Sequence, residues 1–156
     1  MIDEQTYLRF CDEALVGMRD MVLELGDDLA NTRPDLPGAN TPYAILTHCL
    51  AVVARWASTV NLGEIVPRDR DAEFVAIGPV AALAADTDRT RVALRDWVAR
   101  SHPRSAPANP TPGRQDWYAT TQGGVLFHVY EELAQHRGHL ELTRDVLLAA
   151  QSHPES

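Results

Sequence analysis

The sequence predicts an all-α protein, and in particular a four-helix bundle. Four segments repeat apolar residues at steps of three or four positions, which is the spacing of one buried helical face. Segments rich in proline and glycine separate them, and no segment alternates apolar and polar residues as a half-buried strand does. Because 156 residues are enough for one domain with its own core, we expect a single domain over residues 1–156.

The first two helices are indicated by their ends as well as by their apolar faces. We expect the first over residues 6–25, ending near Gly26, because glycine readily adopts the left-handed conformation that follows many helices. We expect the second over residues 42–61. Thr41 can cap its first turn, and Pro42 suits the first helical position because its missing N–H is not needed there.

The third and fourth helices lie on either side of a proline-rich loop. Pro79 opens the third helix, which should end before His102. Its inner side is expected to carry Leu83, Thr87, Leu94 and Val98. Four prolines between residues 101 and 113 predict an extended loop, whereas no proline interrupts residues 121–150. The fourth helix is therefore expected over residues 121–150, although each of its three glycines costs about 1 kcal/mol relative to alanine.

Composition and charge narrow the possible partners and the compartment. The formal net charge is −8 and no basic cluster with interleaved aromatic residues occurs, so we expect no nucleic-acid partner. The alternating run Arg68-Asp69-Arg70-Asp71 is expected to be a solvated loop. There is no signal-peptide pattern and no run of about 18 apolar residues, which predicts a cytoplasmic protein without a membrane partner. Cys11 and Cys49 are expected to be buried thiols.

The fourth helix directs some of its polar residues inward. On a wheel of about 100° per residue, an apolar arc is formed by Val125, Val129, Leu133, Leu140 and Leu147. His136 lies near the middle of this arc, and Glu132 lies about 40° from it. His128 and His139 fall at the edge of the arc, and Glu131 is turned toward solvent. Glu132 and His136 are therefore predicted to face the interior together.

An inward glutamate needs a partner, because an ionised carboxylate loses several kcal/mol on leaving water unless it is paired or binds a metal. His48 in the second helix lies close to the apolar face of that helix and is a candidate partner. An inward histidine alone is more often a hydrogen-bonded core residue than a ligand. Two imidazoles and a carboxylate converging inside a bundle, however, favour a divalent metal site formed by His48, Glu132 and His136.

Other motif-based sites do not match the sequence. Glu132 lies four residues before His136, so neither the zinc-protease HExxH pattern nor the Glu-x-x-His pair of di-iron bundles is present. There is no phosphate-binding glycine loop, and no GxSxG sequence that would indicate a serine hydrolase.

Two stretches of the sequence resemble the DinB/YfiT-like metal-binding four-helix bundles. They are TPYAILTHCLAVVARW and GGVLFHVYEELAQHRGHLELTRDVL. Within that superfamily the chain is similar, over essentially its whole length, to the mycothiol-dependent transferase and maleylpyruvate-isomerase N-terminal-like branch. Many members hold their metal with three histidines, whereas this chain has Glu132 at the first position of the last pair. The resemblance to the isomerase-like variant implies a zinc site of His48, Glu132 and His136.

The same resemblance implies a function and its limits. The isomerase-like members carry a second, C-terminal domain, whereas this sequence ends at Ser156, so we expect general thiol S-transfer rather than isomerisation. Three protein ligands leave one open position on a tetrahedral ion, where a thiol of ordinary pKa about 8.5 would lose its proton and attack an electrophilic small molecule. The resemblance implies mycothiol as the thiol.

Ni²⁺ or Fe²⁺ could replace Zn²⁺ as the metal at this site. We expect the protein to form a homodimer.

Residues around the ligands have weaker sequence signals. His128, His139 and Thr143 lie near the ligands on the wheel and could orient them or contact the substrate. The HRGH sequence departs at His139 from the HRGQ-like sequence of the family, which implies a pocket role for this residue rather than ligation. Arg55 lies about 20° from His48 and could meet an anionic substrate group or simply face solvent.

Two other functions remain open at this point. Two histidines and one carboxylate also form the iron(II) site of some oxygenases, so an iron-dependent oxygenase is one alternative. The other is a non-enzymatic, stress-associated metal-binding bundle.

Metal binding should weaken as the pH falls through about 6, because His48 and His136 must be neutral to act as ligands and protons compete with the metal below their pKa values. Zinc affinity measured by competition with a chelator between pH 8 and pH 5 checks this. Unchanged metal retention at pH 5 would count against the proposed ligands.

Overall fold

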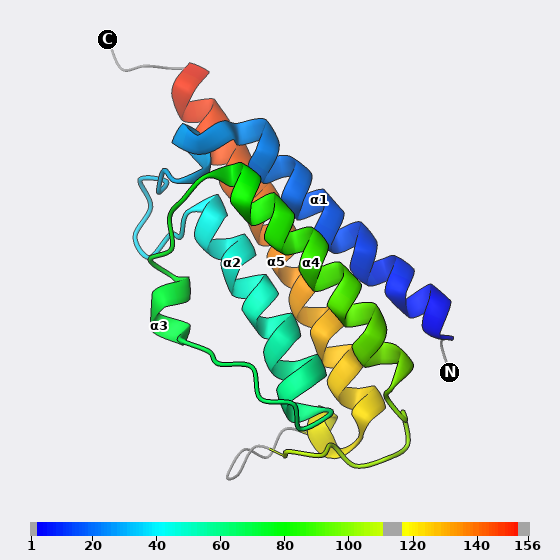
Figure 1. The fold of residues 1–156 in the computed structure, drawn as a ribbon. Coiled ribbons are helices and arrows are strands. Elements are labelled where there is room, and N and C mark those ends of the chain that lie inside the picture. Colours follow the sequence, from blue (N-terminus) through cyan, green and yellow to red (C-terminus); the bar gives the residue numbers. More distant parts are fainter. Residues whose placement is uncertain (1–2, 111–116, 153–156) are drawn as a thin grey trace.

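The computed structural model describes residues 3–110 and 117–152, and within these residues it contains helices and no strand. The four long helices are α1 (Glu4–Ala30), α2 (Pro42–Val53), α4 (Val80–Ala99) and α5 (Gln122–Ser152). They lie side by side as a bundle, in which α1 and α5 run in one direction and α2 and α4 in the other (Figure 1). The predicted all-α four-helix bundle is confirmed.

The first helix is longer than the sequence predicted. Gly26 adopts the non-helical angles φ 68° and ψ 177°, so the chain kinks there, and a second helical segment follows directly up to Ala30. The helical turn after the kink is held in place from outside the helix, because Ala30 is fully buried and the Asn31 side chain donates to the Gly78 carbonyl at 2.9 Å. The interruption predicted near Gly26 is present as this kink, but the sequence did not predict the helical segment that follows it, which tertiary contacts retain.

The second helix begins where the sequence predicted. The Thr41 hydroxyl accepts a hydrogen bond from the Ala44 N–H, and Pro42 occupies the first turn. Its last part changes to π-helical geometry, η1 (Ala54–Val60). Residues 42–60 are long and apolar enough to cross a membrane by length and composition, but 72% of this stretch is buried in the bundle, as expected for a core helix.

The third long helix and the loop after it also follow the sequence. The buried residues of α4 are the four predicted for its inner side: Leu83, Thr87, Leu94 and Val98. Residues 101–110 of the proline-rich loop have no regular secondary structure, and residues 111–113 of the predicted loop lie outside the described residues. A short 3₁₀ helix, η2 (Trp117–Thr120), then leads into α5.

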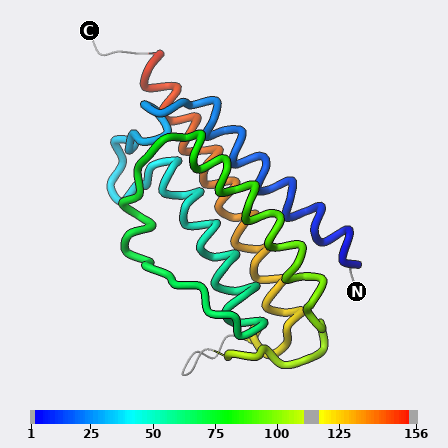
Figure 2. The backbone as a smooth tube through the Cα atoms, viewed as in Figure 1, coloured from blue at the N-terminus to red at the C-terminus, as the bar shows by residue number. Residues whose placement is uncertain are grey.

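The connection between α2 and α4 contains one element that the sequence did not predict. Because the two helices point the same way, residues 61–79 return along the length of the bundle beside α2 (Figure 2). They include the one-turn helix α3 (Arg70–Glu73), capped by the Asp69 carboxylate. Arg68, predicted to be solvated, instead forms an ion pair with the buried Glu73. The solvated-loop prediction was thus wrong for this arginine.

The core is made of side chains from all four long helices. Its fully buried members include Leu15 and Met18 of α1, Leu46 and Val53 of α2, Leu94 of α4, and Val125, Val129, Leu133 and Leu140 of α5. Both cysteines are buried and free, as the sequence predicted.

Truncation of a core leucine should destabilise the bundle far more than truncation of an exposed one on the same helix. Leu15 of α1 is fully buried, whereas Leu23 is 42% exposed. We expect Leu15→Ala to lower the free energy of unfolding by about 2–5 kcal/mol through lost burial and a residual cavity, and Leu23→Ala to lower it by less than about 1 kcal/mol. Urea denaturation followed by circular dichroism measures both. Equal losses would contradict the packing of α1.

Candidate metal centre

The contact between α2 and α5 brings the three predicted ligands together. His48 lies in α2, and Glu132 and His136 lie one turn apart in α5. One possible ligand atom from each of the three lies within 4.8 Å of the other two. The His48 and His136 rings meet edge to face, with their centroids 4.9 Å apart. In the described part of the chain, no other three histidine, cysteine or acidic residues form such a group.

The donor set and its spacing suit a divalent ion. Glu132 Oε2 lies 3.5 Å from His136 Nε2, close to the roughly 3.4 Å that separates two ligands bound at about 2.1 Å with tetrahedral geometry. His136 Nε2 and the Glu132 carboxylate therefore face each other at about the separation expected of two ligands on one ion. The residues present therefore fit a metal ion held by two imidazoles and one carboxylate.

The charges at the site favour the protonation states that a metal requires. A hydrogen bond with His136 is the main cause that lowers the pKa of the Glu132 carboxyl, outweighing the opposite effect of burial. Burial is the main cause that lowers the pKa of His48, and the nearby His136 adds to it. At neutral pH, Glu132 is therefore ionised and His48 is neutral.

His48 has a polar partner that the sequence analysis did not predict. Its Nδ1 lies 2.8 Å from Oε2 of Glu73, which is only 5% exposed. Burial alone would raise the pKa of Glu73, but hydrogen bonds from Arg68 and His48 outweigh it and lower the pKa. Because an ionised carboxylate only accepts hydrogen bonds, His48 carries its proton on Nδ1 and leaves Nε2 free to bind a metal.

His128 lies beside Glu132 in an aromatic environment. Its ring stacks on Tyr118 with a centroid distance of 4.0 Å and meets the edge of Trp56 at 4.8 Å. Its Nε2 lies 3.6 Å from Oε1 of Glu132, and its Nδ1 lies 3.1 Å from the exposed Glu131. The predicted position of His128 next to the ligands agrees with these contacts.

The other residues singled out in the sequence are more loosely connected to the centre. His139 is exposed as a whole residue, and its ring centroid lies 5.9 Å from that of His136. Part of its ring is shielded from water, which is the main cause that lowers the pKa of His139. The Thr143 hydroxyl donates to the His139 carbonyl and so bonds to the helix backbone. Arg55 in η1 is half-buried and makes no hydrogen bond or ion pair with the residues that the structure describes.

Neither cysteine is suited to act as the nucleophile. Cys49 follows His48 directly, but its thiol is fully buried and contacts the sulfur of Met18 at 3.8 Å. Burial raises the pKa of the Cys49 thiol strongly and that of the Cys11 thiol to about 12. Both side chains are therefore protonated at neutral pH, and neither offers a thiolate.

Fold and site together define a class: a helical bundle with a two-histidine, one-carboxylate cluster, suited to a divalent metal, between α2 and α5. A comparison with protein-family models matches residues 6–148 to the mycothiol-S-transferase family. The match spans most of the 156 residues, so the chain belongs to this family, and the resemblance seen in the sequence is confirmed. Searches of curated proteins and of solved structures found no significant match.

Proposed function

We propose that the protein is a zinc-dependent S-transferase in which His48, Glu132 and His136 hold the metal and mycothiol is the thiol substrate. The observation that carries this proposal is the convergence of the three ligand atoms within 4.8 Å of one another. Membership of the mycothiol-S-transferase family supports the thiol and the type of reaction. The two imidazoles and one carboxylate support zinc, since such three-ligand sets are found in catalytic zinc sites.

In this proposal the protein prepares the site and does not itself supply the nucleophile. A bound zinc ion would lower the pKa of a coordinated thiol, so that a thiolate is present near neutral pH. Glu132 contributes a negative charge to the site, and His48 and His136 contribute nitrogen lone pairs. The buried cysteines do not compete for the electrophile because they stay protonated.

The main alternative to zinc is iron(II), because oxygenases use the same number of histidines and carboxylates. Family membership favours thiol transfer over oxygen chemistry.

Replacing Glu132 by alanine should abolish both metal binding and S-transfer, because it removes the one charged donor of the centre. We expect about one zinc ion per chain in the tag-free wild-type protein and almost none in Glu132→Ala. Elemental mass spectrometry measures the metal, and turnover of mycothiol with a generic electrophile measures the activity. Glu141→Ala, which removes a carboxylate from an ion pair with Arg137 further along α5, should leave both unchanged.

Equal and negligible metal in the wild-type and Glu132→Ala proteins, after purification under zinc-replete conditions, would contradict the proposed centre. Retained turnover in a metal-free Glu132→Ala protein would contradict the metal-dependent reaction while leaving the family assignment intact.

We further propose that Arg55 binds an anionic group of the electrophilic substrate. All the other half-buried arginines in the described ranges pair with carboxylates: Arg19, Arg68, Arg91, Arg137 and Arg144. Arg55 has no such partner there, although it lies two helical turns after His48 on the same side of the helix. Nothing among the described residues compensates the hydration that this half-buried guanidinium loses, and a substrate carboxylate would do so.

Substitution Arg55→Gln should therefore weaken the binding of anionic electrophiles selectively. A hydrogen bond to a charged group contributes about 1.5–3 kcal/mol, so we expect KM for a carboxylate-bearing electrophile to rise about tenfold or more. KM for an uncharged electrophile of the same reactivity should change by less than about twofold. Steady-state kinetics with the two electrophiles measure both values. A similar change for both electrophiles would contradict a role in charge recognition.

A further inference from the structure

The connection between α2 and α4 reaches the candidate metal centre from outside the four long helices. Glu73 ends α3 and accepts a hydrogen bond from His48 Nδ1 at 2.8 Å. The next residue, Phe74, stacks on the His48 ring, with a centroid distance of 4.9 Å and an interplanar angle of 28°. Two consecutive residues of one connection thus contact both the edge and the face of this imidazole.

Arg68 holds the Glu73 carboxylate in place. Its Nε lies 2.6 Å from Oε1 of Glu73, and its Nη2 lies 2.9 Å from Oε2. Such a two-bond pair fixes the plane of a carboxylate as well as its position. Oε2 of Glu73 accepts from both Arg68 and His48, so rotation of the carboxylate would break contacts on both sides.

Arg68, rather than His48, supplies the positive charge that the buried Glu73 carboxylate needs. Glu73 is almost fully buried, and a buried carboxylate needs a compensating charge. The guanidinium of Arg68 supplies that charge, so no protonated imidazole is required. A neutral His48 can therefore donate from Nδ1 and keep the lone pair of Nε2 for a metal.

We propose that Glu73, held by Arg68, is a positioning residue for the metal ligand His48. It fixes the ring orientation and the tautomer that exposes the Nε2 lone pair, as carboxylates beside metal-binding histidines do. This inference rests on the proposed function, because it requires His48 to bind a metal. A purely structural tie between α2 and the connection would instead stabilise the fold without any specific effect on metal affinity.

Zinc affinity of Glu73→Gln tests the proposal. The amide of glutamine can present either its oxygen or its NH₂ group to His48, so it no longer selects one tautomer, and the two-bond pair with Arg68 and the charge are lost. We expect zinc to bind about 10–100-fold more weakly than to the wild-type protein, measured by competition with a chromophoric chelator. The stability of the metal-free protein, measured by denaturation, is recorded for each variant.

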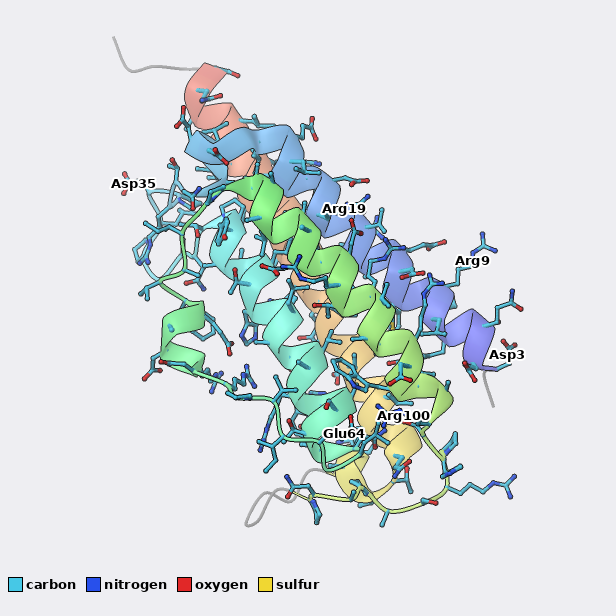
Figure 3. The ribbon with its side chains drawn as sticks, in the orientation of Figure 1. Asp3, Arg9, Arg19, Asp35, Glu64 and Arg100 are labelled. Atoms are coloured by element: carbon cyan, nitrogen blue, oxygen red, sulfur yellow. The ribbon has the colours of Figure 1, made fainter. Side chains whose placement is uncertain are left out.

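Glu64→Gln is the matched control. Glu64 lies in the same connection and is paired with Arg100, whose Nη2 lies 3.0 Å from its Oε2, at the end of the bundle away from α3 (Figure 3). This substitution removes the same charge and a similar ion pair without touching His48. Zinc affinity should stay within about twofold of the wild-type value, as expected for an exposed pair.

A second variant and a second readout separate positioning from loss of structure. Glu73→Gln leaves Arg68 without its carboxylate partner. The double variant Glu73→Gln/Arg68→Met leaves no unpaired charge and is therefore measured beside it. It should show the same loss of zinc affinity, about 10–100-fold. Nitrogen-15 NMR of the metal-free proteins reports the tautomer of His48. We expect the Nδ1–H form in the wild-type protein and a mixture of both tautomers in the two variants.

The outcomes are distinct. If the wild-type protein binds zinc and Glu73→Gln binds it equally well, the positioning role is overturned and the proposed function stands. If the variants lose stability but retain both zinc affinity and the Nδ1–H tautomer, the contact is a structural tie only and the proposal is overturned. If the wild-type protein binds no zinc, the metal-dependent function and the positioning role both fail.

Discussion

The packing of α2 against α5 is the interaction on which the rest of the structure depends. Cys49 and Val53 of α2 and Val129 and Leu133 of α5 are all fully buried, and each of the valines and the leucine contributes about 1.5–3 kcal/mol. His48 and Glu132 precede two of these residues in the sequence, so the apolar contact that orients the helices also brings these polar groups together. The apolar burial is large enough to offset the several kcal/mol that a poorly hydrated carboxylate costs.

The direction of the helices explains why the connection 61–79 takes part in the site. A chain that leaves the end of α2 must return to the other end before α4 can run parallel to it, so it passes along the side of α2 (Figure 1). A shorter connection would have forced α4 to run antiparallel to α2. The length that the topology requires is what places Glu73 and Phe74 against His48.

The parts of the structure that follow a helical repeat could be predicted from the sequence, and those that depend on distant contacts could not. The inner residues of α4 and the meeting of His48 with Glu132 and His136 follow from the faces of long amphipathic helices. The helical segment of α1 after Gly26 depends on the burial of Ala30 and on the two hydrogen bonds between Asn31 and Gly78, one donated by each residue, which no local pattern reveals. Glu73 lies in a four-residue helix without a repeat, and its alternating-charge neighbourhood resembles a solvated loop. The predicted convergence of three donors agrees with the structure, while metal binding by them stays a prediction.

The charge of Glu132 acts on two different groups at the centre. It offers an anionic donor to a cation. It also raises the pKa of the neighbouring Cys49 thiol, and only burial raises that pKa more. The same carboxylate that would attract a metal therefore helps to keep the nearest protein sulfur protonated. A thiolate can form where a cation compensates this negative charge, but not inside the core where Cys49 lies. This electrostatic difference favours an external thiol over a protein thiol, as membership of the mycothiol-S-transferase family implies.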